Sequence, residues 1–426
     1  MTKSESFIGN RNAQKLWFKI AFILILTGIG AGMTGMLLAM LLRVIQHVAY
    51  GYGFDDTMES FLLGATNASD RRRILVLAAC GSVAGIGWWA VHRFGKPIVS
   101  VKKAIVLDAP EMPFGSTLVH ALLQIVTVGM GSPLGREVAP REVGALIASE
   151  ICKRADIAPS MRQVIIACGA GAGLAAVYNV PIGGAVFVLE VLLITFSWHV
   201  ALMALTASVI GAGIAWIGLG AQEQYTIPHF SLSTNLIVFA ILCGPLFGVA
   251  GYGFVRLTGR ARANAVRGMK LVLFCFVNFA FIGCLAVWIP QILGNGKGPA
   301  ELGFEGEVGL GVAAVLLVAK VFITTTTLRS GAEGGLLTPS LAIGALLATL
   351  IGYGWNSLWP GAPLGAIAII GATAFLASSM SMPLSAIILV AEFTRIDHDF
   401  LVPVMLAVAG SVGASRLCTA KFQALH

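Results

Sequence analysis

Two short segments combine a flexible backbone with residues suited to binding an anion inside a membrane. The first, GSPLGREVAP (131–140), places Gly135, Arg136 and Glu137 just before a proline that suits the first turn of a helix. The N–H groups and the positive dipole end of such a helix favour an anion, either the Glu137 carboxylate or a free ion. A carboxylate that competes with a halide is a gate, because it fills the site when ionised and leaves when protonated. The alternative is a structural ion pair of Glu137 with Arg136 or Arg141.

The second segment, GAEGGLLTPSLAIGA (331–345), repeats this arrangement with Leu337 where the first segment has Glu137. Gly335 allows close approach of the backbone, and a proline again starts the following helix. We expect the backbone N–H groups around Gly335, Leu336 and Leu337 to form a second anion cradle without a gate of its own. The alternative is a glycine-rich helix crossing that binds no ligand.

The composition places both segments in a membrane protein. Of the 426 residues, 57% are apolar and 11% are charged, and the mean hydropathy is +0.87. A soluble domain carries about 25% charged residues, so this chain cannot cover a soluble surface. A disordered chain, a disulfide scaffold and a nucleic-acid-binding protein are excluded. The net charge of +8 is typical of basic cytoplasmic loops.

The apolar stretches indicate discontinuous helices. Several are too short or too interrupted by Gly and Pro to cross about 30 Å of hydrocarbon, which needs about twenty residues. Broken helices at membrane depth survive where protein or water satisfies the freed backbone groups, so they tend to line a site. Lys15 and Lys19 precede a first apolar run without a cleavage site, which predicts a retained span and a cytoplasmic N-terminus.

The chain contains an internal repeat at an offset of about 200 residues. GAGAGLAAVYNVPIGGAVFVLE (169–190) matches GATAFLASSMSMPLSAIILVAE (371–392), and GALIAS (144–149) matches GALLAT (344–349). These matches predict two copies of one unit. The expected division is a cytoplasmic segment 1–15, a first half 16–220, a linker 221–233, a second half 234–418 and a short tail 419–426.

These residues resemble the CLC family of chloride channels and proton-coupled chloride transporters. GREVA (135–139) stands where the family has GREGP, GGLLTP (334–339) stands where it has GGxFxP, and the segment 169–190 is also similar. The resemblance implies an all-α inverted repeat of about eighteen helices and a homodimer with one pore in each subunit. It also implies that Glu137 is the external gate and that Leu337 offers its N–H to the anion.

The sequence departs from the family pattern at three positions. The central serine of the family's GSGIP motif, an anion ligand, aligns with Lys96, which puts an ammonium beside the anion path or leaves a lysine at the cytoplasmic surface. Val191 replaces an internal glutamate that relays protons in many coupled members. The inner-gate tyrosine would fall near Ala424. The usual inner proton route is therefore missing.

Other titratable groups are expected to modulate the site or to pack. Glu142 lies five residues after Glu137, where it could raise the proton affinity of the gate by like-charge repulsion or pair with Arg141. The seven histidines, His92 and His120 among them, are scattered and are expected to be packed or interfacial residues. No metal or cofactor is expected.

The sequence therefore predicts transport of chloride or another small anion, with protons acting on Glu137, in the inner membrane of a bacterium. A passive or loosely proton-coupled pathway is favoured, and a stoichiometric chloride/proton antiporter with a different inner proton route is the alternative. A solute carrier and an intramembrane enzyme are alternatives of another class. Against an enzyme, the chain has neither HExxH nor GxSxG.

Overall fold

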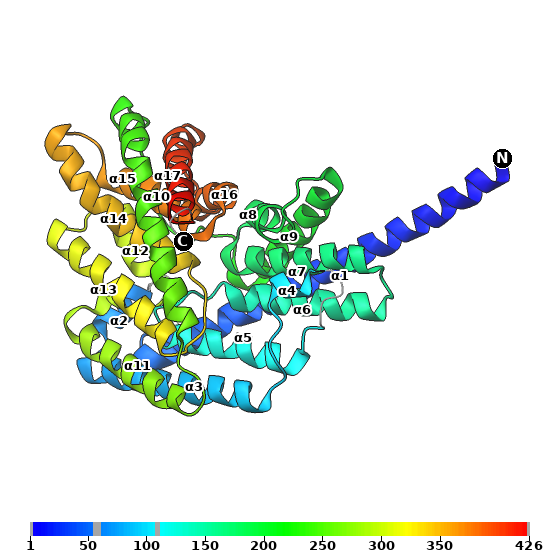
Figure 1. The fold of residues 1–426 in the computed structure, drawn as a ribbon, viewed down its shortest axis with the longest axis horizontal. Helices are drawn as coiled ribbons and strands as arrows, with labels where there is room; N and C mark the ends of the chain where they lie inside the picture. The colour runs from blue at the N-terminus through cyan, green and yellow to red at the C-terminus, as the bar shows by residue number, and fades with distance from the viewer. Residues whose placement is uncertain (1–2, 54–60, 107–110, 424–426) are drawn as a thin grey trace. The chain divides into compact units, whose positions relative to one another are not determined.

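The computed structural model describes residues 3–53, 61–106 and 111–423, and within these the chain forms 17 α-helices and no strand (Figure 1). This confirms the all-α fold expected from the sequence. In chain order the helices are α1 (Lys3–Tyr50), α2 (Phe61–Asn67), α3 (Asp70–Phe94), α4 (Val101–Ala104), α5 (Phe114–Gly129), α6 (Val138–Arg154), α7 (Pro159–Tyr178), α8 (Pro181–Phe187), α9 (Trp198–Leu219), α10 (Thr234–Ala263), α11 (Lys270–Trp288), α12 (Lys297–Glu305), α13 (Leu310–Arg329), α14 (Leu337–Leu358), α15 (Leu364–Met380), α16 (Pro383–Thr394) and α17 (Leu401–Gln423).

Helix lengths fall into two groups. In the part of the chain that the structure describes, nine helices are long and apolar enough to cross a bilayer. Four apolar segments of 10–17 residues, such as Phe114–Gly129, are shorter than the roughly twenty residues a full crossing needs. The chain is thus an integral membrane protein that combines full spans with partial ones, as the interrupted apolar stretches predict.

The first of two compact units contains residues 1–37, 98–117 and 140–221. Its core is built from α7, which is buried without interruption from Ile165 to Tyr178 and packs against α8 and α9. Small residues bring its backbones close together, since a Cβ on Gly144 would overlap the carbonyl of Gly169.

The second unit contains residues 38–97, 118–139 and 222–426. In this unit α10 packs along α15 and α17, α14 packs on α15, and α11 packs on α3 (Figure 1). Pro245 interrupts the hydrogen-bond ladder of α10, and its ring lies against Gly410 of α17. All the loops that carry the two cradle motifs belong to this unit.

Helix breaks recur at equivalent positions of the sequence repeat. Asn179 ends α7 in the left-handed conformation with φ 56°, and Ser381 ends α15 in the same way with φ 54°. In both cases a proline, Pro181 or Pro383, then begins the next helix. The shared break pattern supports the predicted duplication, and the boundaries of the two halves stay a prediction.

Candidate anion-binding site

Two glycine-rich loops, 200 residues apart in sequence, meet through their backbones. The amide N of Gly135 lies 2.8 Å from the carbonyl O of Gly335, and the amide N of Gly335 lies 2.9 Å from the carbonyl O of Gly135. One loop leads into α6 and the other leads into α14. The pairing therefore brings the residue before α6, Glu137, to the N-terminus of α14.

The side chain of Glu137 occupies that N-terminus. Its Oε1 accepts a hydrogen bond from the backbone N–H of Leu337 at 2.7 Å, and Glu137 is fully buried. Leu337 is the first residue of the 22-residue helix α14, and its N–H has no partner within the helix. An exposed N–H at the positive end of a long helix dipole favours a negative charge. Here the negative charge is the carboxylate of the protein itself.

The Glu137 carboxylate packs closely against both glycines where the loops cross. A Cβ added to Gly135 or to Gly335 would overlap the carboxylate of Glu137. A side chain at either position would therefore displace the gate carboxylate.

Two basic side chains of the same unit, Arg136 and Lys297, contact one segment of the chain. Arg136 is half-buried, and its guanidinium donates to Oε1 of Gln224 at 3.5 Å. The ammonium of Lys297 lies 5.9 Å from the centre of the Tyr225 ring. Gln224 and Tyr225 are adjacent, and the backbone N–H of each donates to the backbone carbonyl of Phe393 at 3.0 Å. This segment therefore fixes the positions of two cations near the loop of Glu137.

The cations in this region also affect one another. Burial lowers the pKa of Lys297. The negative charge of Glu301 raises this pKa, and the positive charges of Arg136 and Arg43 lower it. The mutual repulsion shows that several positive charges share one region of the unit. Such a region attracts small anions.

The three positions at which the sequence departs from the family pattern are Lys96, Val191 and the expected inner-gate position, Ala424. Lys96 is exposed between α3 and α4, which favours the surface position that the sequence left open. Val191 lies in a π-helical turn, Val188–Leu192, that continues α8. The position expected for the inner-gate tyrosine, Ala424, lies outside the described residues.

Arg141 and Glu142 both belong to the first unit. The guanidinium of Arg141 lies 5.1 Å from the ring centre of Phe187, and Glu142 is buried in α6. The proposed influence of these two residues on the gate stays a prediction.

The structure also brings together three titratable residues that sequence spacing does not connect. Oε1 of Glu333 lies 3.0 Å from Nε2 of His92, and Oε2 lies 2.9 Å from Nε2 of His120. Partial burial would raise the pKa of Glu333, but the hydrogen bonds from His120 and His92 outweigh it and lower the pKa to about 2. Glu333 stands inside the second motif, GAEGG, which was the only sequence signal for its position.

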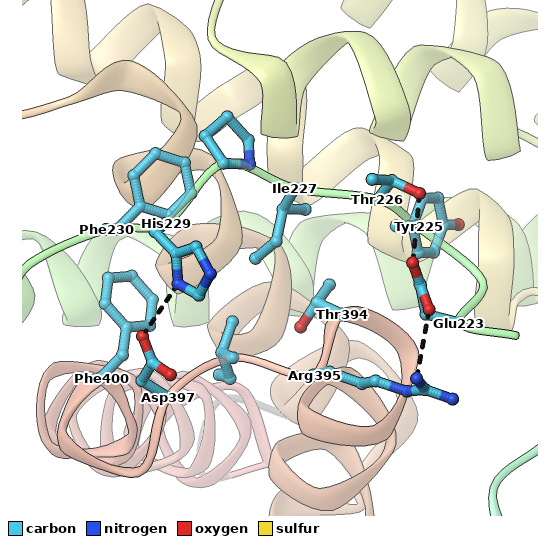
Figure 2. Close-up of a pocket in the computed structure, with 12 residues that line it drawn as sticks. Glu223, Tyr225, Thr226, Ile227, His229, Phe230, Thr394, Arg395, Asp397 and Phe400 are labelled. Carbon is cyan, nitrogen blue, oxygen red and sulfur yellow. Dashed lines mark hydrogen bonds and ion pairs between the residues drawn. The ribbon is translucent and has the colours of Figure 1, made fainter.

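A separate cavity of about 240 Å³ lies between the segment 223–230 and the segment 394–400 (Figure 2). Figure 2 shows two polar contacts on its wall, an ion pair of Glu223 with Arg395 at 3.4 Å and a hydrogen bond between His229 and Asp397 at 3.3 Å. Because these side chains are paired with each other, the cavity is not a second cradle of the kind formed by the two loops.

Interrupted helices, duplicated helix breaks and a carboxylate seated on a helix N-terminus define the chain as a membrane protein built to handle small anions. The family model for the voltage gated chloride channel matches residues 80–416. The chain belongs to this family.

Relatives and solved structures agree with this assignment. The chain is 29% identical over 359 residues to the voltage-gated ClC-type chloride channel ClcB of Citrobacter koseri, covering 79% of this chain and 82% of the relative. It is 28% identical over 409 residues to the H(+)/Cl(-) exchange transporter ClcA of Yersinia pestis, covering 91% and 83%. Its fold is similar to that of a slow cyanobacterial Cl-/H+ antiporter, with a TM-score of 0.81 at 18% identity over 94% of this chain and 95% of the other. It is also similar to a CLC-type fluoride/proton antiporter, with a TM-score of 0.67 at 19% identity over 93% and 95%.

Proposed function

We propose that the chain transports chloride or another small anion across the membrane, and that protonation of Glu137 opens the path. The main observation in support is the 2.7 Å hydrogen bond from the Leu337 N–H to the Glu137 carboxylate. The ionised carboxylate holds the donor that an anion would use. A neutral acid group binds that N–H more weakly, because a charge-assisted hydrogen bond is about twice as strong as a neutral one. Protonation therefore frees the N–H for the transported anion.

Anion binding at this site uses backbone donors and surrounding charge. The N–H groups of Leu336 and Leu337 supply the second cradle, whereas the N–H of Gly335, which the sequence also offered, is taken by the carbonyl of Gly135 in the facing loop. Arg136 and Lys297 raise the local concentration of anions. Backbone donors respond to the charge and radius of an ion, so a choice among chloride, fluoride and nitrate is not encoded in the donor types.

The coupling to protons has two candidate forms. A passive or loosely coupled pathway is favoured by Val191, which cannot carry a proton at the position of the usual inner acid. Stoichiometric antiport is favoured by the relatives named as exchange transporters, ClcA among them. We propose that the protein works as a homodimer in the bacterial inner membrane, with a separate path in each subunit and a cytoplasmic N-terminus, and that it has no enzymatic activity.

Halide flux from liposomes, recorded together with external pH, tests the function and separates the two forms. Chloride efflux without proton movement would support the passive pathway, whereas a fixed proton-to-chloride ratio would support antiport. No halide flux above that of empty liposomes would contradict anion transport. Uptake of an organic solute that is unaffected by Glu137→Gln would support a solute carrier instead.

A further inference from the structure

One carboxylate, held by two imidazoles, lies two residues before the second cradle. Glu333 belongs to the loop between α13 and α14, His92 belongs to α3 and His120 belongs to α5. Each imidazole Nε2 contacts a different oxygen of the carboxylate, at 3.0 Å and 2.9 Å. We name these three side chains the imidazole clamp. His92 and Glu333 are about two-fifths exposed, at 43% and 41%, whereas the His120 side chain is only 4% exposed.

The clamp has two hydrogen-bonding states that differ by one proton. An ionised carboxylate only accepts hydrogen bonds, so Nε2 of His120 carries its hydrogen toward Glu333. The Nδ1 atom of the same ring lies 3.0 Å from Nε2 of Gln124, so neutral His120 accepts from that amide. A second proton on His120 would occupy Nδ1, and the Gln124 amide would then turn its oxygen toward the ring. Proton uptake therefore converts the contact to Glu333, already charge-assisted by the carboxylate, into a hydrogen-bonded ion pair.

The loop held by the clamp is the loop that positions the anion donors. Gly335 forms the backbone pair with Gly135, and Leu337 donates to Glu137. Between the clamp and this pair, the carbonyl of Gly334 accepts from the Arg262 guanidinium at 3.1 Å. The clamp and the glycine pair thus fix the loop on both sides of Gly334, so a change in the clamp acts directly on the donors of the cradle.

The clamp lies at a basic end of the second unit. Arg262 is in the last turn of α10, and exposed Arg329 and Lys270 stand at the adjoining ends of α13 and α11. The three side chains are not a metal-ligand set, because within the described residues no group of three His, Cys, Asp or Glu is arranged to hold a metal ion.

We propose that Glu333 is a positioning residue for the second cradle, and that protonation of the imidazole clamp tightens the loop and strengthens anion binding. Imidazole is the side chain suited to this task, because its charge changes near neutral pH. The inference rests on the proposed function of the cradle. It adds a site of proton action separate from the gate.

Chloride binding to the purified protein, measured by titration calorimetry between pH 8 and pH 5.5, tests the proposal. The experiment uses the Glu137→Gln variant as its background, so that titration of the gate does not contribute. In this background we expect chloride affinity to rise about threefold as the pH falls, the size typical of a partly exposed ion pair. Adding Glu333→Gln should remove this rise and lower the affinity at pH 5.5 by about the same factor.

The matched control is Asp397→Asn in the same background. It removes the carboxylate of the His229–Asp397 pair in the cavity of Figure 2, outside both cradle loops, and should leave the pH profile unchanged. If Glu333→Gln does not fold, His92→Gln removes one half-exposed arm of the clamp and should remove about half of the rise. Coincident profiles with and without the clamp substitution would overturn the inference. An absence of any chloride binding to Glu137→Gln would instead refute the proposed function.

Discussion

Replacement of Glu137 by Gln is the sharpest perturbation of the candidate site, because it keeps the shape of the side chain and removes its charge. The carboxylate accepts the N–H of Leu337 in a fully buried position. A hydrogen bond to a charged group contributes about 1.5–3 kcal/mol, and a neutral one contributes about 0.5–1.5 kcal/mol. The substitution therefore weakens the internal competitor by about 1–1.5 kcal/mol. Chloride that competes for this N–H should bind about tenfold more tightly.

Titration calorimetry at neutral pH measures this change, and liposome flux shows whether opening still depends on pH. We expect the variant to bind chloride about tenfold more tightly and to lose the part of the pH dependence that comes from the gate. Glu307→Gln is the control. Glu307 is exposed in the loop after α12, so this substitution removes one charge and leaves both cradles unchanged. Equal chloride affinity and equal pH dependence in the native chain and in Glu137→Gln would refute the competition between carboxylate and anion.

Substitutions at four further residues give expected results. Gly335→Ala places a methyl group where the gate carboxylate lies and should displace it from the Leu337 N–H, so chloride should bind about tenfold more tightly; a fall in affinity would show a different defect. Lys297→Met should weaken chloride binding about threefold at low salt. An unchanged affinity would show that the charge of Lys297 does not act on the bound anion. Lys96→Ser should change the chloride affinity less than about twofold, because Lys96 is exposed. A larger change would show that Lys96 lies beside the anion path. The pKa of Glu333 is lowered to about 2 from 4.5, so its stabilising contribution is present above pH 4.5 and lost as the pH falls toward 2. Thermal unfolding of Glu333→Gln should therefore vary less over this range than that of the native chain.

The sequence alone determined the class of protein and the chemistry of its loops. The low charge content requires a membrane environment, because so few charged side chains cannot cover a soluble surface. Gly, Pro and Glu in GREVA, together with the glycines of GGLLTP, indicate backbone N–H groups at two helix starts. These are local properties, set by residues next to one another in the chain.

Two features depended on contacts between segments far apart in the chain. Sequence spacing left open whether Glu137 pairs with a neighbouring arginine or competes for an anion donor. The structure places it on the N–H of Leu337, 200 residues away. His92 and His120 stood in the sequence as scattered histidines, and only the packing of α3 and α5 beside the loop of Glu333 brings them together.

The physical reason is that a hydrogen bond joins atoms about 3 Å apart, whatever their separation along the chain. Local sequence fixes where a helix begins and which donors it exposes. Which carboxylate or imidazole reaches those donors depends on how the helices of the second unit pack, and that packing is a property of the whole unit.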